Sequence, residues 1–338
     1  MRNICELKKK QYFQQNKVTV TGSPEDLRTW IYQLKDNGLF VREILIDSGK
    51  HDNNIVEIVQ LSDLHINYFN KKDMGDEELL LTRQHRKWNA NAACIPAIQK
   101  AMEYAMFFDQ TMITGDTLDF LSEGAIELMH KYIWDVDPDV LIALGGHELV
   151  KQMQTGIKDK TPLEVRRRIL EKAWKHDIYY VSKVIKNKVI VVALDNGNHE
   201  YFEEQLQKLT TDIKMARENG YVILLFQHEA ISTGKPEDAN KECFRQYDGK
   251  YQNFYNDCIG NDEQDNQITR EMYRLITENA DVIKGLFCGH YHSAYYTEVK
   301  ASYIDEKGEK QETYIPQPVL TPSAYDNYAG HVMKIKVI

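Results

Sequence analysis

The stretch VEIVQLSDLH, residues 56–65, decides the fold of this chain. Its first six residues are typical of a buried strand, and a carboxylate, Asp63, and an imidazole, His65, follow directly. Similar apolar runs recur downstream, each ending in polar residues and followed by an amphipathic segment. They cover residues 111–114, 140–144, 189–194, 221–226 and 282–288. This alternation predicts an α/β protein.

Helices are expected between these runs, because apolar residues recur there at helical spacing. The apolar stripes lie within residues 94–105, 126–133, 202–213 and 268–276. A further helix is expected to begin at Thr161, with Pro162 and Glu164 completing a capping box. An N-terminal helix is expected over residues 23–38, with Ser23 as its N-cap.

The last part of the chain has a different pattern. After residue 292 it becomes β-rich around a turn at residues 305–308, and residues 331–338 alternate between polar and apolar. This pattern predicts a second sheet or a sheet edge.

The composition is that of a folded protein, and it restricts the partners. Hydrophobic residues make up 42% and charged residues 28% of the 338-residue chain. A formal net charge of −9 disfavours broad binding of nucleic acid. The five cysteines have no CxxC spacing, and the sequence contains neither a signal core nor an apolar stretch of membrane-spanning length. We therefore expect a cytoplasmic protein with no membrane partner.

Chemically active side chains follow most of the expected strands. Seven of them stand just past a strand end: Asp63, His65, Asp116, His147, His228, His290 and His292. In open α/β sheets that edge binds ligands. One such residue alone is more often structural, but independent structural residues have no reason to recur at the same edge. Imidazole and carboxylate donors suit Mn, Fe, Zn or Co better than Mg or Ca.

Five short motifs follow one another along the chain: LSDLH at residues 61–65, GDTLD at 115–119, GGHE at 145–148, His228, and GHYH at 289–292. Their order resembles that of the calcineurin-like metallophosphoesterases, over most of residues 55–292. The resemblance implies two mixed β-sheets packed as a sandwich flanked by helices. It also implies a metallophosphoesterase domain over residues 51–338, preceded by an N-terminal extension, residues 1–50, with a helix packed on that domain.

The same resemblance implies the roles of the site residues. Asp63, His65 and His292 would hold one metal ion, and His228 and His290 the other. Asp116 would bridge both ions through its two carboxylate oxygens, and a hydroxide shared by the ions would attack phosphorus. The two ions would be divalent or trivalent Mn, Fe or Zn.

Residues beside the ligands complete the implied site. His147 would assist the leaving group and Asp119 would orient it; the alternative for Asp119 is a residue in the first turn of a helix. Glu148 is expected to fix its turn rather than to react. Tyr291 is a candidate substrate contact.

Gly146 departs from the family pattern, which has a metal-binding Asn at this position. Water, a backbone carbonyl or another side chain would have to replace the amide oxygen. The tetrapeptide GNHE at residues 197–200 matches the usual motif but falls in a later strand-helix unit. We therefore interpret it as a decoy, with a ligand role for Asn198 or His199 as the minority hypothesis.

Three functions remain open at this stage. The first is hydrolysis of a phosphomonoester or phosphodiester, with a small-molecule or nucleotide ester as substrate. The alternatives are a non-catalytic or weakly active interaction scaffold of the same fold, and a nuclease of the same fold.

Two long connections, residues 67–91 and 231–266, are expected to border the substrate site. Their candidate contacts, for which a solvated face or an ordinary loop cluster is the competing interpretation, are Lys71, Lys72, Arg83, Arg86, Phe244, Tyr247, Tyr251, Phe254 and Tyr255.

Overall fold

The computed structural model describes residues 18–21, 39–50, 53–152, 158–233, 259–260, 265–292, 295–320, 322–324 and 330–338. The expected helix at residues 23–38 and the aromatic group at residues 244–255 lie outside these ranges. Among the residues described, no helix combines the length and apolar character that crossing a membrane requires.

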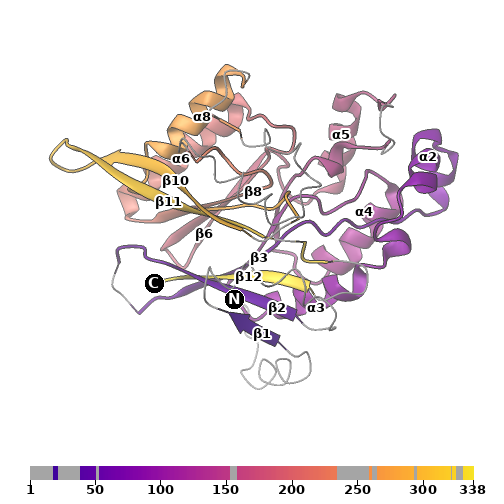
Figure 1. Ribbon diagram of the computed structural model, residues 1–338, viewed down its shortest axis with the longest axis horizontal. Coiled ribbons are helices and arrows are strands. Elements are labelled where there is room, and N and C mark those ends of the chain that lie inside the picture. Colours follow the sequence, from indigo (N-terminus) through magenta and orange to yellow (C-terminus); the bar gives the residue numbers. More distant parts are fainter. Residues whose placement is uncertain are drawn as a thin grey trace.

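The first sheet has six strands in the spatial order β1-β2-β12-β3-β4-β5 (Figure 1). Their bounds are Val18–Thr21 for β1, Leu39–Ile46 for β2, Gly330–Val337 for β12, Val56–Leu61 for β3, Gln110–Thr114 for β4 and Leu141–Ala143 for β5. The sheet is mixed, because β12 runs parallel to β2 but antiparallel to β3. Strands β3, β4 and β5 are parallel, so their carboxyl ends share one edge.

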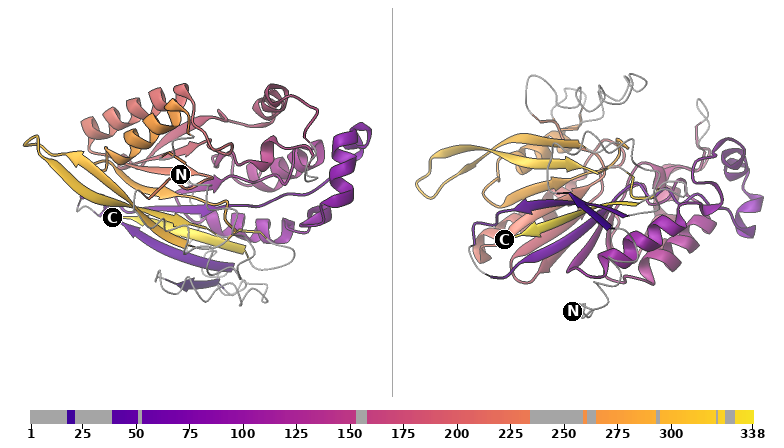
Figure 2. Two further views of the ribbon diagram at one scale, coloured as in Figure 1. Left: turned by 45° about the horizontal axis from the view of Figure 1, so that its top comes forward. Right: turned by 60° about the horizontal axis from the view of Figure 1, so that its bottom comes forward.

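The second sheet has four strands in the order β6-β7-β8-β9. These are Tyr180–Ile185, Val189–Leu194, Val222–Gln227 and Ile283–Phe287. Only β6 is antiparallel to its neighbour. Strands β10 (Tyr295–Ile304) and β11 (Lys310–Val319) form a long hairpin that projects away from the sheets (Figures 1 and 2).

The two sheets pack face to face, with helices on both outer faces. Side chains such as Ile58 and Met112 of the first sheet share a buried layer with Leu224 and Phe226 of the second. Helices α3 (Ile95–Ala105), α4 (Glu123–Met129) and α5 (Leu163–Ala173) belong to the core on the outer side of the first sheet. Helices α6 (Glu203–Asn219) and α8 (Gln267–Thr277) cover the second. The expected sandwich of two mixed sheets flanked by helices is therefore confirmed.

All six expected strands after residue 50 are present, with ends shifted by one residue at most, and the β-rich tail forms β10, β11 and β12. Three strands were not expected: β1, β2 and β6. Strand β2 pairs with β12 over eight residues although it lies within the expected N-terminal extension. The division at residue 50 stays a prediction.

One expectation for a helix was wrong in detail. The N-cap of α5 is Pro162, which has no side-chain cap, because the Thr161 hydroxyl donates to the Glu78 carboxylate instead. Within the long connection at residues 67–91, the structure adds helices that the sequence did not predict: short 3₁₀ helices at Lys71–Gly75 and Ala90–Ala92, and helix α2 over Glu77–His85.

Candidate metal centre

The segments that follow β3, β4, β5, β8 and β9 meet at one edge of the sandwich and carry the candidate ligands. Five of these ligands have a positive backbone φ: Asp63 (51°), His65 (44°), Asp116 (50°), His290 (73°) and His292 (52°). Residues with a Cβ rarely adopt this left-handed region, and such strain persists where the surrounding structure enforces it. The abrupt turns direct these side chains toward a common point.

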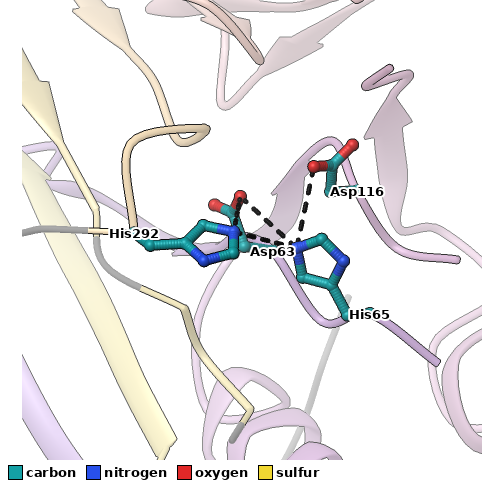
Figure 3. Close-up of side chains that lie close together, drawn as sticks. All are labelled: Asp63, His65, Asp116 and His292. Atoms are coloured by element: carbon teal, nitrogen blue, oxygen red, sulfur yellow. Dashed lines mark hydrogen bonds and ion pairs between the residues drawn. The ribbon is translucent and has the colours of Figure 1, made fainter. Parts of the chain in front are cut away.

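Asp63, His65, Asp116 and His292 form the first cluster of donor atoms (Figure 3). The Nε2 atoms of His65 and His292 are 3.0 Å apart, and Oδ1 of Asp63 lies 3.4 Å from Nε2 of His292. Asp63 is fully buried, and its Oδ2 accepts a hydrogen bond of 2.5 Å from the Ser62 hydroxyl. Four side chains from three separate chain segments thus converge on one point.

Asp116, His228 and His290 form the second cluster. Oδ2 of Asp116 lies 3.2 Å from Nε2 of His228, which is in turn 3.2 Å from Nδ1 of His290. The same Oδ2 lies 3.6 Å from Nε2 of His65 in the first cluster. Oδ1 of Asp116 instead accepts the backbone N–H of His147 at 3.0 Å. Oδ2 of Asp116 therefore faces both clusters, and a bridge through both of its carboxylate oxygens stays a prediction.

These distances fit a cation in each cluster. A metal ion bound tetrahedrally to imidazole nitrogens, with bonds of about 2.0–2.1 Å, places two donor atoms about 3.3 Å apart. The nitrogen pairs at 3.0 and 3.2 Å are close to that separation. Nitrogen and carboxylate donors together also match the preferences of Zn, Mn and Fe.

Hydrogen bonds on the far side of two imidazoles fix which nitrogen faces the clusters. Nδ1–H of His65 donates to the Asp119 carboxylate at 3.0 Å, and Nδ1–H of His228 donates to the Thr114 carbonyl at 2.8 Å. Burial lowers the pKa of His65 to about 4, against the opposing pull of Asp119, so this imidazole is neutral at physiological pH. Each Nε2 is thereby aimed at the donor cluster, as ligation requires.

The two carboxylates of the clusters are held in their charged form. Burial would raise the pKa of Asp116, but the neighbouring His228 and His147 keep it well below the usual value. Burial opposes charge on Asp63 as well, and its hydrogen bond with His292 contributes most to a lowered pKa. Both groups are therefore ready to bind a cation.

Comparisons with known proteins found similarity to solved structures at low identity. No family model and no curated protein matches this chain. Among solved structures, it is similar to a dimetal phosphatase from Danio rerio, with 11% identity, 79% of this chain and 87% of that chain covered, and a TM-score of 0.40. It is also similar to purple acid phosphatase PPD1 from yellow lupin, Lupinus luteus, with 11% identity, 82% and 46% covered, and a TM-score of 0.43. A third similar structure is the calcineurin-like phosphoesterase YfkN from Bacillus subtilis, with 13% identity, 79% of this chain and 81% of that chain covered, and a TM-score of 0.32.

The order of the five motifs along the chain resembles that of the calcineurin-like metallophosphoesterases. At these TM-scores and identities the structural likeness carries no activity over to this chain, so the side chains at the centre have to support any function.

The candidate metal centre reaches solvent at three partly exposed imidazoles, His147, His290 and His292. The side chains of His147 and His292 are 27% and 32% exposed, whereas those of Asp63, His65, Asp116 and His228 are at most 3% exposed. Molecules in solution would therefore reach the centre from the side of these three imidazoles.

His147 lies beside both clusters with one nitrogen facing them. Its Nδ1–H donates to the backbone carbonyl of Asp119 at 2.9 Å, and its Nε2 lies 3.9 Å from Oδ2 of Asp116. Burial would lower the pKa of His147, but the charges of Asp116 and Asp119 outweigh it and raise the pKa to about 9. The imidazole therefore carries a proton in the protein without bound cations.

Asp119 connects several side chains of the centre. It is fully buried and precedes α4, so it is not a residue in the first turn of that helix. Its carboxylate accepts from His65, from Asn67 at 3.0 Å and from both sides of the Arg86 guanidinium. Burial opposes its charge, but these bonds and His147 hold its pKa well below the usual range.

Glu148 holds two turns together, as the sequence predicted. Its buried carboxylate accepts backbone N–H groups from Asp116, Thr117, Leu118 and Gly145, at 2.5–3.3 Å. Burial, together with the charge of Asp116, raises its pKa to about 7. The turn that carries Asp116 is thereby fixed to the turn that carries His147.

Trp88 belongs to the centre but was not anticipated from the sequence. Its ring packs against His65 and His292, with ring centroids 4.3 and 4.7 Å apart, and Arg86 lies over the same ring. Both residues come from the long connection at residues 67–91, whose length was the one sequence signal that pointed toward the site.

The other candidate substrate contacts within the described residues are exposed or pack against a neighbouring side chain. Lys71, Lys72 and Arg83 are exposed, and Lys72 pairs with the exposed Glu127. Tyr291 is mostly buried against the ring of His290, and its role as a substrate contact stays a prediction.

Proposed function

We propose that this chain is a dinuclear metal-dependent phosphoesterase that hydrolyses a phosphomonoester or a phosphodiester. The observation that carries the proposal is the position of Oδ2 of Asp116, 3.6 Å from Nε2 of His65 and 3.2 Å from Nε2 of His228. One anionic oxygen shared by two donor clusters reduces the repulsion between two cations held close together.

The residues would divide between two ions. Asp63, His65, His292 and Asp116 would hold one, and Asp116, His228 and His290 the other, with Mn, Fe or Zn as the metals that suit these donors. When bound, such a pair offsets phosphate charge and lowers the pKa of coordinated water toward neutrality. Asp119 and Thr114 orient the imidazoles of His65 and His228 by accepting hydrogen bonds from their Nδ1–H groups.

His147 is the candidate general acid. Its Nδ1–H is engaged by the Asp119 carbonyl, so the proton that it can give up sits on Nε2, the atom that faces Asp116 and the centre. An imidazole held in one orientation can protonate a leaving oxygen without reorganisation. The preferred substrate is a small-molecule or nucleotide phosphate ester, since a net charge of −9 disfavours polyanions.

Metal analysis coupled to activity assays tests the proposal. The purified protein would be stripped with a chelator, reloaded with Mn²⁺, Zn²⁺ or Fe²⁺, and assayed with p-nitrophenyl phosphate, bis-p-nitrophenyl phosphate and a single-stranded oligonucleotide. We expect chelation to abolish hydrolysis and reloading to restore it. Asp116→Asn should remove nearly all activity, while the matched change Asp139→Asn at an exposed position should leave it intact.

Hydrolysis by metal-free protein, or full activity in Asp116→Asn, would contradict the proposal. Preference for the oligonucleotide over both small esters would favour the nuclease alternative instead.

A scaffold with little or no catalysis is the second candidate, and Gly146 is the observation that favours it. The backbone at this position offers no side-chain donor where the family has an amide. A scaffold of this kind would retain fewer than two ions per chain and would hydrolyse none of the three substrates under any metal loading.

A further inference from the structure

The second cluster has fewer donors than the first. Asp116, His228 and His290 provide three atoms, whereas the first cluster has four. Imidazole and carboxylate sites for Zn, Mn or Fe have at least four ligands. Gly146 has no side chain that could supply the missing donor.

The turn at residues 195–199 lies directly against Gly145 and Gly146. A Cβ atom built on Gly197 would come within 2.3 Å of the carbonyl carbon of Gly145, so only glycine allows this approach. A Cβ built on Gly146 would lie 3.0 Å from the carbonyl oxygen of Gly197. The turn thus occupies the space into which a side chain at position 146 would extend.

This turn is also fixed to the candidate ligand His228. Oδ1 of Asn196 accepts the backbone N–H groups of His228 and Glu229, both at 3.0 Å, and its Nδ2 donates to the Glu229 carbonyl at 2.9 Å. On the other side, Asp195 accepts the N–H of Gly197 and pairs with Arg167. The turn is therefore rigid with respect to the second cluster.

Asn198 stands between two residues that border the second cluster. Gly197 before it touches Gly145, and the ring of His199 after it lies 6.3 Å from the ring of His290, centroid to centroid. Nδ2 of Asn198 is buried and has no hydrogen-bond partner among the residues that the structure describes. A buried amide N–H group without a partner costs about 1–3 kcal/mol.

The amide of Asn198 is better placed for ligation than its neighbour. Nδ1 of His199 pairs with the buried Glu229 carboxylate at 2.9 Å, and its side chain is 53% exposed. The oxygen and nitrogen of an asparagine amide exchange places when the terminal torsion rotates by half a turn. This rotation places the amide oxygen, which can bind a cation, at the buried position.

We propose that Asn198 supplies, through its amide oxygen, the side-chain ligand of the second metal ion that Gly146 cannot provide. The chain then keeps an asparagine ligand by taking it from the turn after β7 instead of the turn after β5. The GNHE tetrapeptide is in that case part of the centre rather than a decoy. The inference rests on the proposed dinuclear function, but it can fail separately.

Binding of Mn²⁺ and Zn²⁺ to the whole chain measures this directly. Isothermal titration gives the number of ions and the affinity of each, and Mn²⁺ electron paramagnetic resonance detects the coupled pair. We expect two ions in the wild type. In Asn198→Ala the second ion should bind about 10- to 100-fold more weakly while the first is unchanged. Asn198→Asp, which keeps an oxygen, should retain both ions. Asn219→Ala, the matched change at an exposed asparagine at the end of α6, should retain both ions as well.

Gly146→Asn provides the converse test. Because its Cβ would press on the Gly197 carbonyl, we expect weaker binding of the second ion and no gain. Equal affinity for the second ion in wild type and Asn198→Ala, or tighter binding in Gly146→Asn, overturns this inference and leaves the dinuclear proposal in place. A wild type that binds fewer than two ions overturns the proposed function itself.

Discussion

Arg86 holds the Asp119 carboxylate through two hydrogen bonds of 2.7 Å, from Nε to Oδ2 and from Nη2 to Oδ1. The same carboxylate accepts Nδ1–H of His65, and the backbone carbonyl of Asp119 accepts Nδ1–H of His147. Arg86 thus acts, through one aspartate, on a candidate ligand and on the candidate general acid. A bidentate pair of this kind defines both distance and orientation.

Arg86→Met should therefore weaken the metal centre, because it removes the hydrogen bonds that position Asp119. The buried Asp119 would lose its only arginine partner among the described residues, and the orientation of His65 would loosen. We expect kcat to fall about 10- to 100-fold and the affinity of the first ion to fall by a similar factor. Arg83→Met, on an exposed arginine of the same segment, is the control. Unchanged kcat and metal affinity in Arg86→Met would show that the pair does not position the centre.

Glu148→Gln tests the link between the two turns. Each carboxylate oxygen of Glu148 accepts two backbone N–H groups, so an amide nitrogen in place of either oxygen would face two donors. We expect the free energy of unfolding to drop by about 1–3 kcal/mol in urea denaturation. The exposed Glu103→Gln on α3 should change it by less than about 0.5 kcal/mol. Equal stability of the two variants would mean that these bonds contribute nothing to the fold.

The sequence predicted the centre better than it predicted the edges of the fold. Buried strands such as β3 and β8 are largely apolar runs, and their ends place Asp63 and His228 without further information. Strand β2 mixes Arg42 and Glu43 with apolar residues, and its position depends on pairing with β12, about 290 residues away. Local pattern carries no information about such a distant partner.

The contacts made by the connecting segments could not be predicted from the sequence either. Trp88 and Arg86 follow a helix with almost no apolar stripe, and their roles depend on the path of the chain after α2. The approach of Gly197 to Gly145 joins turns from two different sheets, so no spacing in the sequence indicates it. In both cases tertiary packing decides which side chains reach the centre.

Trp88→Ala should expose the first cluster to water. The indole covers His65 and His292 with ring centroids 4.3 and 4.7 Å away, and its removal would leave a gap on the side of both imidazoles. We expect the first ion to bind about 10-fold more weakly, with the second unaffected, while Trp88→Phe should retain most of the affinity. Metal titration of the three proteins checks this. An equal loss for both ions would instead indicate a general loss of folding.

His176 should make the stability of the fold depend on pH through a group remote from the centre. Its Nε2 accepts the backbone N–H of Ile142 at 3.1 Å, and its Nδ1–H donates to the Asp177 carbonyl at 2.8 Å, so both nitrogens are satisfied only in the neutral ring. Burial lowers the pKa of His176 in the folded protein below its usual value. Below pH about 6.5 the unfolded chain then binds this proton more readily than the folded chain does.

The stability that the neutral His176 provides is therefore complete above pH about 6.5 and declines as the pH falls below it. Urea denaturation between pH 8 and pH 5 should show the free energy of unfolding decreasing more steeply in wild type than in His176→Gln. At pH 8 the variant should be less stable by about 1 kcal/mol, since glutamine replaces the bond to Ile142 imperfectly. The other histidines titrate in both proteins, so only the difference between the two slopes reports on His176. Identical slopes would show that this imidazole takes up its proton in the folded state as easily as in water.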